Sequence, residues 1–288
     1  MKKLIILICI TALLLLCAGC DQEPVQIAAT TRPVYDFTSA LCEGTGLTVG
    51  RLVTENVSCL HDYTLQVSQM RMVEEAEILV LSGLGLEDFL TDILPETTPV
   101  INAAKGIAPM CADNHAGEIG HHHENDPHIW LSPKLAKAMA RNISSELCQQ
   151  YPDSSQIIVH NLAELEARLD ALQTYGEDTL EDLSCREMIT FHDGFAYFCR
   201  DFDLEILKAI EEESGREASA TELISLIRLV EKHQLPAVFL EVNGSVSAAG
   251  VIAREAGCRL FPLDMAMGEN DYFTAMYHNI DSVKEALE

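Results

Sequence analysis

Four residues of this 288-residue chain have side chains that bind metal ions and stand at positions where α/β proteins hold ligands. His192 and Asp264 each directly follow an apolar run that predicts a strand. His61 lies in the loop after another such run, and His128 lies between a fourth run and the start of a helix. Open α/β sheets bind ligands outside the carboxyl ends of their strands. Three imidazoles and one carboxylate can complete a tetrahedral site that suits Zn²⁺, so the spacing predicts one zinc site shared by these four residues.

A second group of histidines lies in the long loop that leads to His128. Five of the ten His of the chain fall between positions 115 and 128, among Gly and acidic residues. This composition is typical of metal-attracting tracts, although an exposed solvated loop is the alternative. We expect a second, weaker zinc site in the loop 113–126, which gathers metal through His115, His121, His122 and His123.

The elements that must position these side chains alternate between strand and helix in two series. Strands are expected at 25–29, 47–53, 78–81 and 99–103, and again at 187–191, 204–209, 237–242 and 259–263. Helices are expected from Arg32, at 68–76, 86–94 and 133–150, and later at 194–202, 219–232, 245–256 and 271–287. Such alternation indicates parallel β-α-β units.

One long helix separates the two series. Apolar residues follow each other at spacings of four and three from Ile158 to Leu172, which predicts a helix of about 25–30 residues. It is either a long core helix or a stiff connector, and we favour the connector because a new β-α series begins after it. We therefore predict an α/β fold of two parallel-sheet lobes joined by a long rigid connecting helix, with the metal site in the inter-lobe cleft. The predicted boundaries are 20–150 for the N-terminal lobe, 151–183 for the helix and 184–288 for the C-terminal lobe.

The first residues have the order of an export signal. Met1-Lys2-Lys3 is positively charged, and the apolar run Leu4–Leu16 is shorter than the about 20 residues of a spanning helix. The ending Leu16-Cys17-Ala18-Gly19-Cys20 resembles a bacterial lipobox, although its C-x-x-C could also suggest a redox or zinc pair. We expect residues 1–19 to be a signal peptide and Cys20 to carry the lipid that anchors the protein, facing outside the cytoplasm.

The composition excludes several classes of protein. A net charge of −26 excludes the basic field that non-specific nucleic-acid binding needs, so no nucleic-acid partner is expected. A hydrophobic content of 48% excludes an acidic disordered protein. Seven cysteines remain after residue 20, an odd number, and the sequence does not decide whether they are paired or buried as thiols.

Four segments, in this order, resemble motifs of the metal-binding lipoproteins of zinc/manganese ABC importers, the ZnuA-like or cluster A-I solute-binding proteins. They are Val57–Thr64, Asp126–Pro133, Phe191–Phe198 and Leu263-Asp264. The resemblance implies that His61, His128 and His192 are metal ligands with Asp264 as the fourth, in two lobes joined by a long helix. It also implies a monomer that delivers metal to an ABC permease and its ATPase. In this family Pro commonly follows the Asp where this chain has Met265, which leaves open whether the fourth ligand is Asp264 or water.

The identity of the metal follows partly from the donors. Some manganese-carrying relatives have Glu where this chain has His192, and imidazole suits Zn²⁺ better than Mn²⁺. Zinc is the prediction, with a manganese- or iron-binding member of the family as the alternative.

An enzyme and an adhesin-like protein are the competing classes. The segment from His123 to His128 is H-E-x-x-x-H, one residue longer than a metalloprotease helix needs, and Pro127 would interrupt that helix. Asp193 and Glu241 could act as bases of a zinc hydrolase, but we favour a role in orienting ligands. We therefore predict no enzymatic activity.

Overall fold

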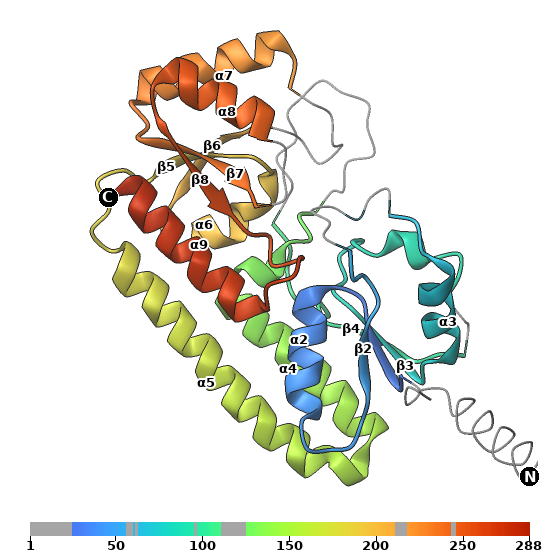
Figure 1. Ribbon diagram of the computed structural model, residues 1–288. Helices are drawn as coiled ribbons and strands as arrows, with labels where there is room; N and C mark the ends of the chain where they lie inside the picture. The colour runs from blue at the N-terminus through green and yellow to red at the C-terminus, as the bar shows by residue number, and fades with distance from the viewer. Residues whose placement is uncertain are drawn as a thin grey trace, which may run out of the picture.

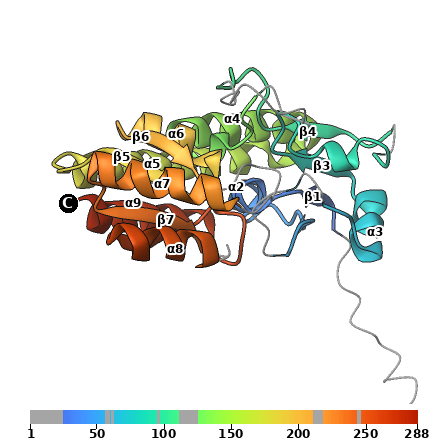
Figure 2. The same ribbon diagram turned by 90° about the horizontal axis from the view of Figure 1, so that it is seen from above.

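The computed structural model describes residues 25–55, 60, 63–94, 97–110, 125–210, 218–242 and 246–288, with the backbone alone at 193, 246 and 247. The predicted signal peptide and Cys20 lie outside these residues. Two α/β lobes with parallel strands lie at the two ends of a long helix (Figures 1 and 2), which confirms the predicted fold class. The part before this helix is called the N-terminal lobe below, and the part after it the C-terminal lobe.

The N-terminal lobe contains a four-stranded parallel sheet of order β2-β1-β3-β4. The strands are β1 (Ile27–Ala29), β2 (Val49–Arg51), β3 (Ile78–Leu81) and β4 (Val100–Asn102), mostly shorter than expected. Helix α2 (Arg32–Cys42) begins with Pro33 in its first turn, where a missing N–H costs nothing. Helix α3 (Val67–Glu75) follows β2. The expected helix at 86–94 is wrong, because only a single 3-10 turn forms there, at Asp88–Leu90.

Helices α4 (Pro133–Gln150) and α5 (Ser155–Leu180) form an antiparallel pair. The Ser132 hydroxyl caps α4 by accepting a hydrogen bond from the Leu135 N–H (3.1 Å). Helix α5 has 26 residues, within the predicted length, and buries Ile158, Leu165, Leu169 and Leu172 of the predicted apolar stripe. It contacts α2 and α4 on one side and α9 of the other lobe, so it packs against both lobes.

The C-terminal lobe contains two parallel strand pairs that lie against each other through β5 and β7. The pairs are β5 (Glu187–Thr190) with β6 (Glu205–Ala209), and β7 (Ala237–Glu241) with β8 (Arg259–Leu263). The helices are α6 (Ala196–Asp201), α7 (Ala220–His233), α8 (Val246–Ala256) and α9 (Tyr272–Leu287). Ser219 and Glu222 form a capping box at the start of α7.

One buried apolar cluster extends through both lobes. It includes Ile27 of β1, Trp130 before α4, Leu169 of α5, and Met188 and Leu263 of the second lobe. The lobes therefore share a core, which opposes wide separation. Five cysteines in the described ranges are free thiols: Cys42, Cys148, Cys185, Cys199 and Cys258. None of the helices in those ranges combines the length and apolar character needed to cross a membrane.

Candidate metal site

Two of the four predicted ligands meet at the junction of the lobes. His128 lies in the N-terminal lobe, just before the 3-10 turn Ile129–Leu131, and His192 follows β5 in the C-terminal lobe. Their ring centroids are 5.1 Å apart, with an interplanar angle of 78°. Both side chains are buried, with 3% and 7% exposure. The fold thus brings together two imidazoles that are far apart in the chain.

The buried carboxylate of Asp126 holds His128 in place. Its Oδ1 accepts hydrogen bonds from the His128 backbone N–H (2.9 Å) and from the ring Nδ1 (2.8 Å). A carboxylate oxygen accepts this bond in the tautomer that carries its proton on Nδ1, and in that tautomer the lone pair lies on Nε2. A carboxylate–histidine pair of this kind is typical of metal sites, where it orients the ligand and raises its basicity. Sequence reasoning did not assign this role to Asp126, although a carboxylate two residues before the imidazole is the available signal.

His192 is held by a different contact. Its Nδ1 accepts a hydrogen bond from the Gly194 N–H (3.1 Å). A neutral imidazole carries one proton, so a metal bound at Nε2 would require that proton to move to Nδ1 and this bond to be lost. Metal binding at Nε2 of this ring would therefore be coupled to a local change at Gly194.

Gly194 also brings the two lobes into close contact. A methyl group added at this position would lie 2.6 Å from Met265 Cε and 2.9 Å from Cγ and Nδ1 of His128. Glycine is required here because the His128 ring and Met265 fill the space that a side chain would need. The contact also places the residue after Asp264 beside His128.

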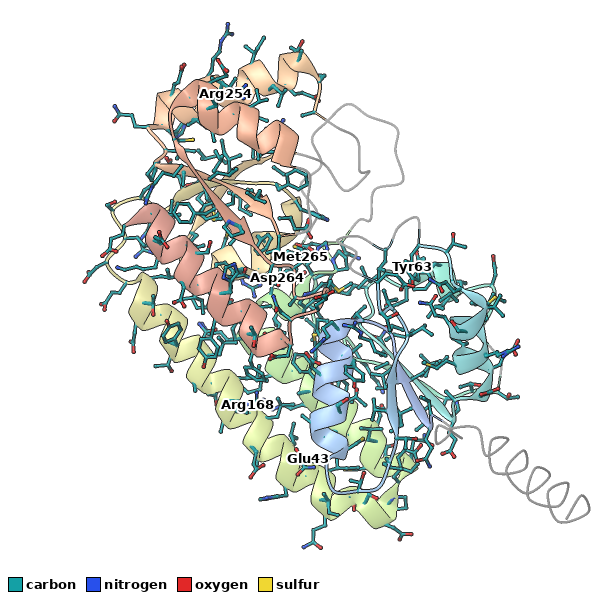
Figure 3. All side chains as sticks on the ribbon, viewed as in Figure 1. Glu43, Tyr63, Arg168, Arg254, Asp264 and Met265 are labelled. Carbon is teal, nitrogen blue, oxygen red and sulfur yellow. The ribbon has the colours of Figure 1, made fainter. Side chains whose placement is uncertain are left out.

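Asp264 directly follows β8 and is buried, where the lobes meet (Figure 3). Its Oδ1 accepts from the Ala266 N–H (2.8 Å), and its Oδ2 accepts from Asn270 Nδ2 (3.0 Å). Asn279 of α9 fixes the backbone on both sides, since its Oδ1 accepts from the Asp264 N–H and its Nδ2 donates to the Asp264 carbonyl oxygen (both 2.7 Å). A carboxylate oxygen has two lone pairs, so each oxygen keeps one for a further partner.

The described residues do not complete the predicted set. Within the ranges that the structure describes, no three His, Cys, Asp or Glu side chains form a group that could hold a metal ion. His61 and the loop histidines His115, His121, His122 and His123 lie outside those ranges, so both the shared site and the second site stay predictions. Glu241 is buried at the end of β7, beside Leu263 in the strand register.

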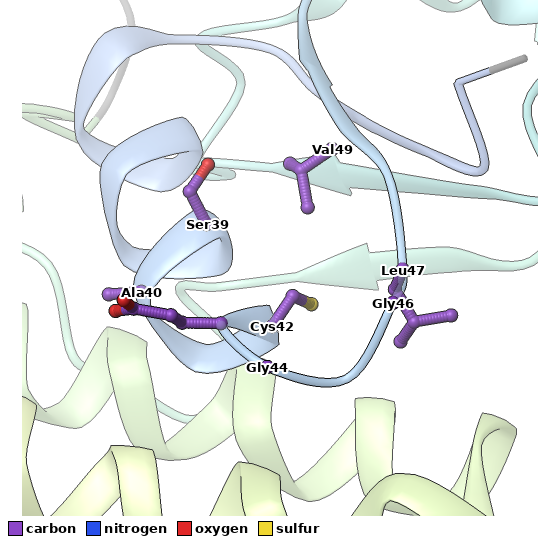
Figure 4. A pocket seen from close by; sticks show the side chains of 8 residues that line it. Ser39, Ala40, Cys42, Gly44, Gly46, Leu47 and Val49 are labelled. Carbon is purple, nitrogen blue, oxygen red and sulfur yellow. The ribbon is translucent and has the colours of Figure 1, made fainter. Parts of the chain in front are cut away.

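A hollow of about 520 Å³ lies elsewhere, between the end of α2 and β2 (Figure 4). Its lining includes Cys42, Glu43 and Leu47. Burial raises the pKa of the Cys42 thiol to about 12, so the thiol stays protonated near neutral pH and is a poor metal ligand. The hollow does not contain any of the predicted ligands.

Comparison with known proteins adds to this geometry. The sequence model of the family described as zinc-uptake complex component A, periplasmic, matches residues 27–286. The chain belongs to this family. The resemblance inferred from the four motifs is thereby confirmed.

Members and relatives of the zinc-uptake component A family match the chain over most of its length. A crystal structure of ZnuA superposes with a TM-score of 0.81 at 31% identity, covering 92% of this chain and all of that one. A protein of Treponema pallidum (strain Nichols), whose name refers to metal binding, is 28% identical over 99% of this chain and 97% of its own length. The zinc-binding lipoprotein AdcA of Streptococcus pneumoniae serotype 4 is 27% identical over the whole of this chain, which spans 62% of that longer protein.

Proposed function

We propose that this chain is the zinc-binding component of an ABC metal importer, which captures Zn²⁺ outside the cytoplasm and delivers it to a membrane permease served by an ATPase. The observation that carries the proposal is the contact of two buried imidazoles, His128 and His192, contributed by opposite lobes. The names of relatives support zinc as the cargo: AdcA is called a zinc-binding lipoprotein, and a ZnuA deletion variant was solved with zinc bound.

The proposed ligands of the main site are His61, His128, His192 and Asp264. Imidazole nitrogen suits Zn²⁺, which also stands far above Mn²⁺ in the order of divalent-metal affinities. The Asp126 contact at Nδ1 of His128 supports this assignment, because it favours the tautomer in which Nε2 is the metal donor. Because the metal binds deprotonated imidazoles, protons compete with it, and affinity should fall as the pH drops.

The remaining parts of the proposal concern the ends and the loop of the chain. After removal of residues 1–19, Cys20 would be lipidated and would hold the protein at the membrane surface. The protein would act as a monomer. The lobe boundaries proposed are 20–150 and 184–288, with 151–183 as the connecting helix. The His-rich loop would hold a weaker second zinc ion, and deletion of 117–124 should then lower the zinc stoichiometry; an unchanged stoichiometry would remove that site.

Zinc affinities of single variants test the main site. Loss of a residue that only orients a ligand costs about 10–100-fold in metal affinity. We expect a larger loss of zinc affinity from each of the variants His61→Ala, His128→Ala, His192→Ala and Asp264→Ala. His160→Ala is the matched control, since the His160 side chain is 72% exposed on α5. Unchanged affinity in all three candidate His variants would contradict the assignment. Tighter binding of Mn²⁺ than of Zn²⁺ in competition would contradict the choice of metal, and peptide hydrolysis by the zinc-loaded protein would favour the hydrolase alternative.

A further inference from the structure

The loop from Met265 to Asp271, between β8 and α9, is held by arginines of the opposite lobe. The Arg51 guanidinium, at the end of β2, donates from Nη1 to the Gly268 carbonyl oxygen (2.9 Å). The Arg32 guanidinium, at the start of α2, donates from Nη1 to the Glu269 carbonyl oxygen (2.9 Å). Hydrogen bonds from a charged donor are stronger than those from a neutral one, so both contacts define where this part of the loop lies.

The first residue of the same loop and the residue directly after the loop are also bonded to the N-terminal lobe. The Trp130 indole donates from Nε1 to the Met265 carbonyl oxygen (2.8 Å), and the Tyr272 N–H donates to Asp36 Oδ2 (2.7 Å). Both carboxylate oxygens of Asp36 in turn accept hydrogen bonds from Arg32 Nε, at 2.8 and 2.9 Å. The loop and the first residue of α9 are therefore bonded to the N-terminal lobe at four points, although both belong to the C-terminal lobe.

The loop conformation determines where the Asp264 carboxylate points. One carboxylate oxygen is bonded to the Ala266 N–H, and the other is bonded to Asn270, the residue after Glu269. The α9 contact through Asn279 holds only the Asp264 backbone. Among the described residues, both hydrogen bonds to the Asp264 side-chain oxygens thus come from the segment that the N-terminal lobe holds.

We propose that Arg32 and Arg51, acting through Asn270, orient the Asp264 carboxylate for metal binding, so that the N-terminal lobe positions the candidate ligand of the C-terminal lobe. This inference rests on the proposed function. It makes Arg32, Arg51 and Asn270 positioning residues that do not touch the metal. It also means that movement of the lobes apart weakens the carboxylate's orientation while it opens the site.

Zinc affinities of Asn270→Ala and Arg51→Met, each in the wild-type and in the Asp264→Ala background, test the proposal. Asn270 is exposed, so its replacement leaves the core intact. We expect each variant to bind zinc about 10-fold more weakly than the wild type, as for other partners behind a ligand. In the Asp264→Ala background the same changes should alter affinity less than about twofold, because the two effects share one path. Arg51→Lys, which can still donate to the Gly268 carbonyl, should recover part of the loss.

Arg141→Met is the control, because the Arg141 side chain is 58% exposed and pairs with Glu166 away from the loop. Melting curves of all variants accompany the titrations. If the wild type does not bind zinc, the proposed function fails. If Asp264→Ala weakens binding but Asn270→Ala and Arg51→Met do not, only the positioning role is overturned. Equal losses in both backgrounds would show a general structural effect, and unchanged affinity in Asp264→Ala would remove the ligand itself; either result overturns the inference.

Discussion

Removal of the Asp126 carboxylate tests whether His128 is a metal ligand held in one tautomer. Asp126 Oδ1 accepts from two donors of His128, and the rest of Asp126 is fixed independently. Its N–H donates to the Met110 carbonyl oxygen (3.0 Å), and its own carbonyl oxygen accepts from the Tyr197 hydroxyl (2.8 Å). Asp126→Ala should therefore keep the Asp126 backbone in place and remove only the two hydrogen bonds that hold His128.

The expected effect on zinc binding is a loss of about 10–100-fold in affinity, which equals about 1.4–2.7 kcal/mol. Folding should be affected separately. The His128 N–H and Nδ1–H would lose their acceptor in a buried place, at a cost of about 1–3 kcal/mol each. The variant no longer buries a carboxylate, which offsets part of that cost. Asp126→Asn keeps an acceptor oxygen for both donors, so it should preserve the tautomer and lose less affinity.

The assay is a competition titration of metal-free protein against a chromophoric chelator at constant pH, with melting curves of every variant. Nitrogen–proton NMR correlations of the imidazole report which ring nitrogen carries the proton. Asp203→Ala is the control, since the Asp203 side chain is 94% exposed. Wild-type zinc affinity in Asp126→Ala, with the protein still folded, would refute the reasoning.

Three further predictions concern single side chains. Burial raises the pKa of the Glu87 carboxyl above 4.5, so the stability that its neutral form contributes is complete below that pH and is lost as the pH rises through the folded-state pKa. As the pH rises, the unfolding free energy of the wild type should therefore fall relative to that of Glu87→Gln, by at most about 1.4 kcal/mol per pH unit. Tyr63→Phe removes the hydroxyl that donates to Glu55 and should lower the unfolding free energy in denaturant titrations by about 0.5–1.5 kcal/mol; no change would show that the bond contributes nothing. Gly194→Ala should cost about 1–3 kcal/mol in the same titrations and weaken zinc binding by displacing the neighbouring imidazole, whereas Gly250→Ala, whose methyl meets nothing within 4 Å, should not weaken it.

Most helices and strands could be predicted because their apolar periodicity agrees with their place in the fold. The stripe on α5 and the Ser219 capping box are local signals, and both elements form as expected. The segment 86–94 differs because hydrogen bonds to one buried side chain, Glu87, compete with the helix. The Glu87 carboxylate accepts hydrogen bonds from the Ser82 and Gly83 N–H groups, and Leu84 adopts a positive φ of 58°, so the chain turns where its composition favoured a helix.

The candidate site was predictable to a similar extent. The rule that ligands lie after strand ends indicated that His128 and His192 meet, and the described structure brings them together. The contacts that hold the site were not predictable. Arg51 and Gly268 are 217 residues apart in the chain, and no local pattern marks an arginine that donates to a distant carbonyl oxygen. Such contacts depend on how the lobes pack, which periodicity does not determine.

Each lobe holds the segment that carries a candidate ligand of the other. The Tyr197 hydroxyl of α6 bonds the carbonyl oxygen of Asp126 beside His128, and the Tyr272 hydroxyl of α9 bonds that of Trp130, both at 2.8 Å. In the opposite direction, Arg51 holds the loop after Asp264. These bonds lie near the optimum distance, and a relative shift of about 1 Å would carry them beyond the range in which hydrogen bonds are effective. A small displacement of the lobes would therefore release both ligand segments together, and the shared apolar core makes a small displacement the less costly one.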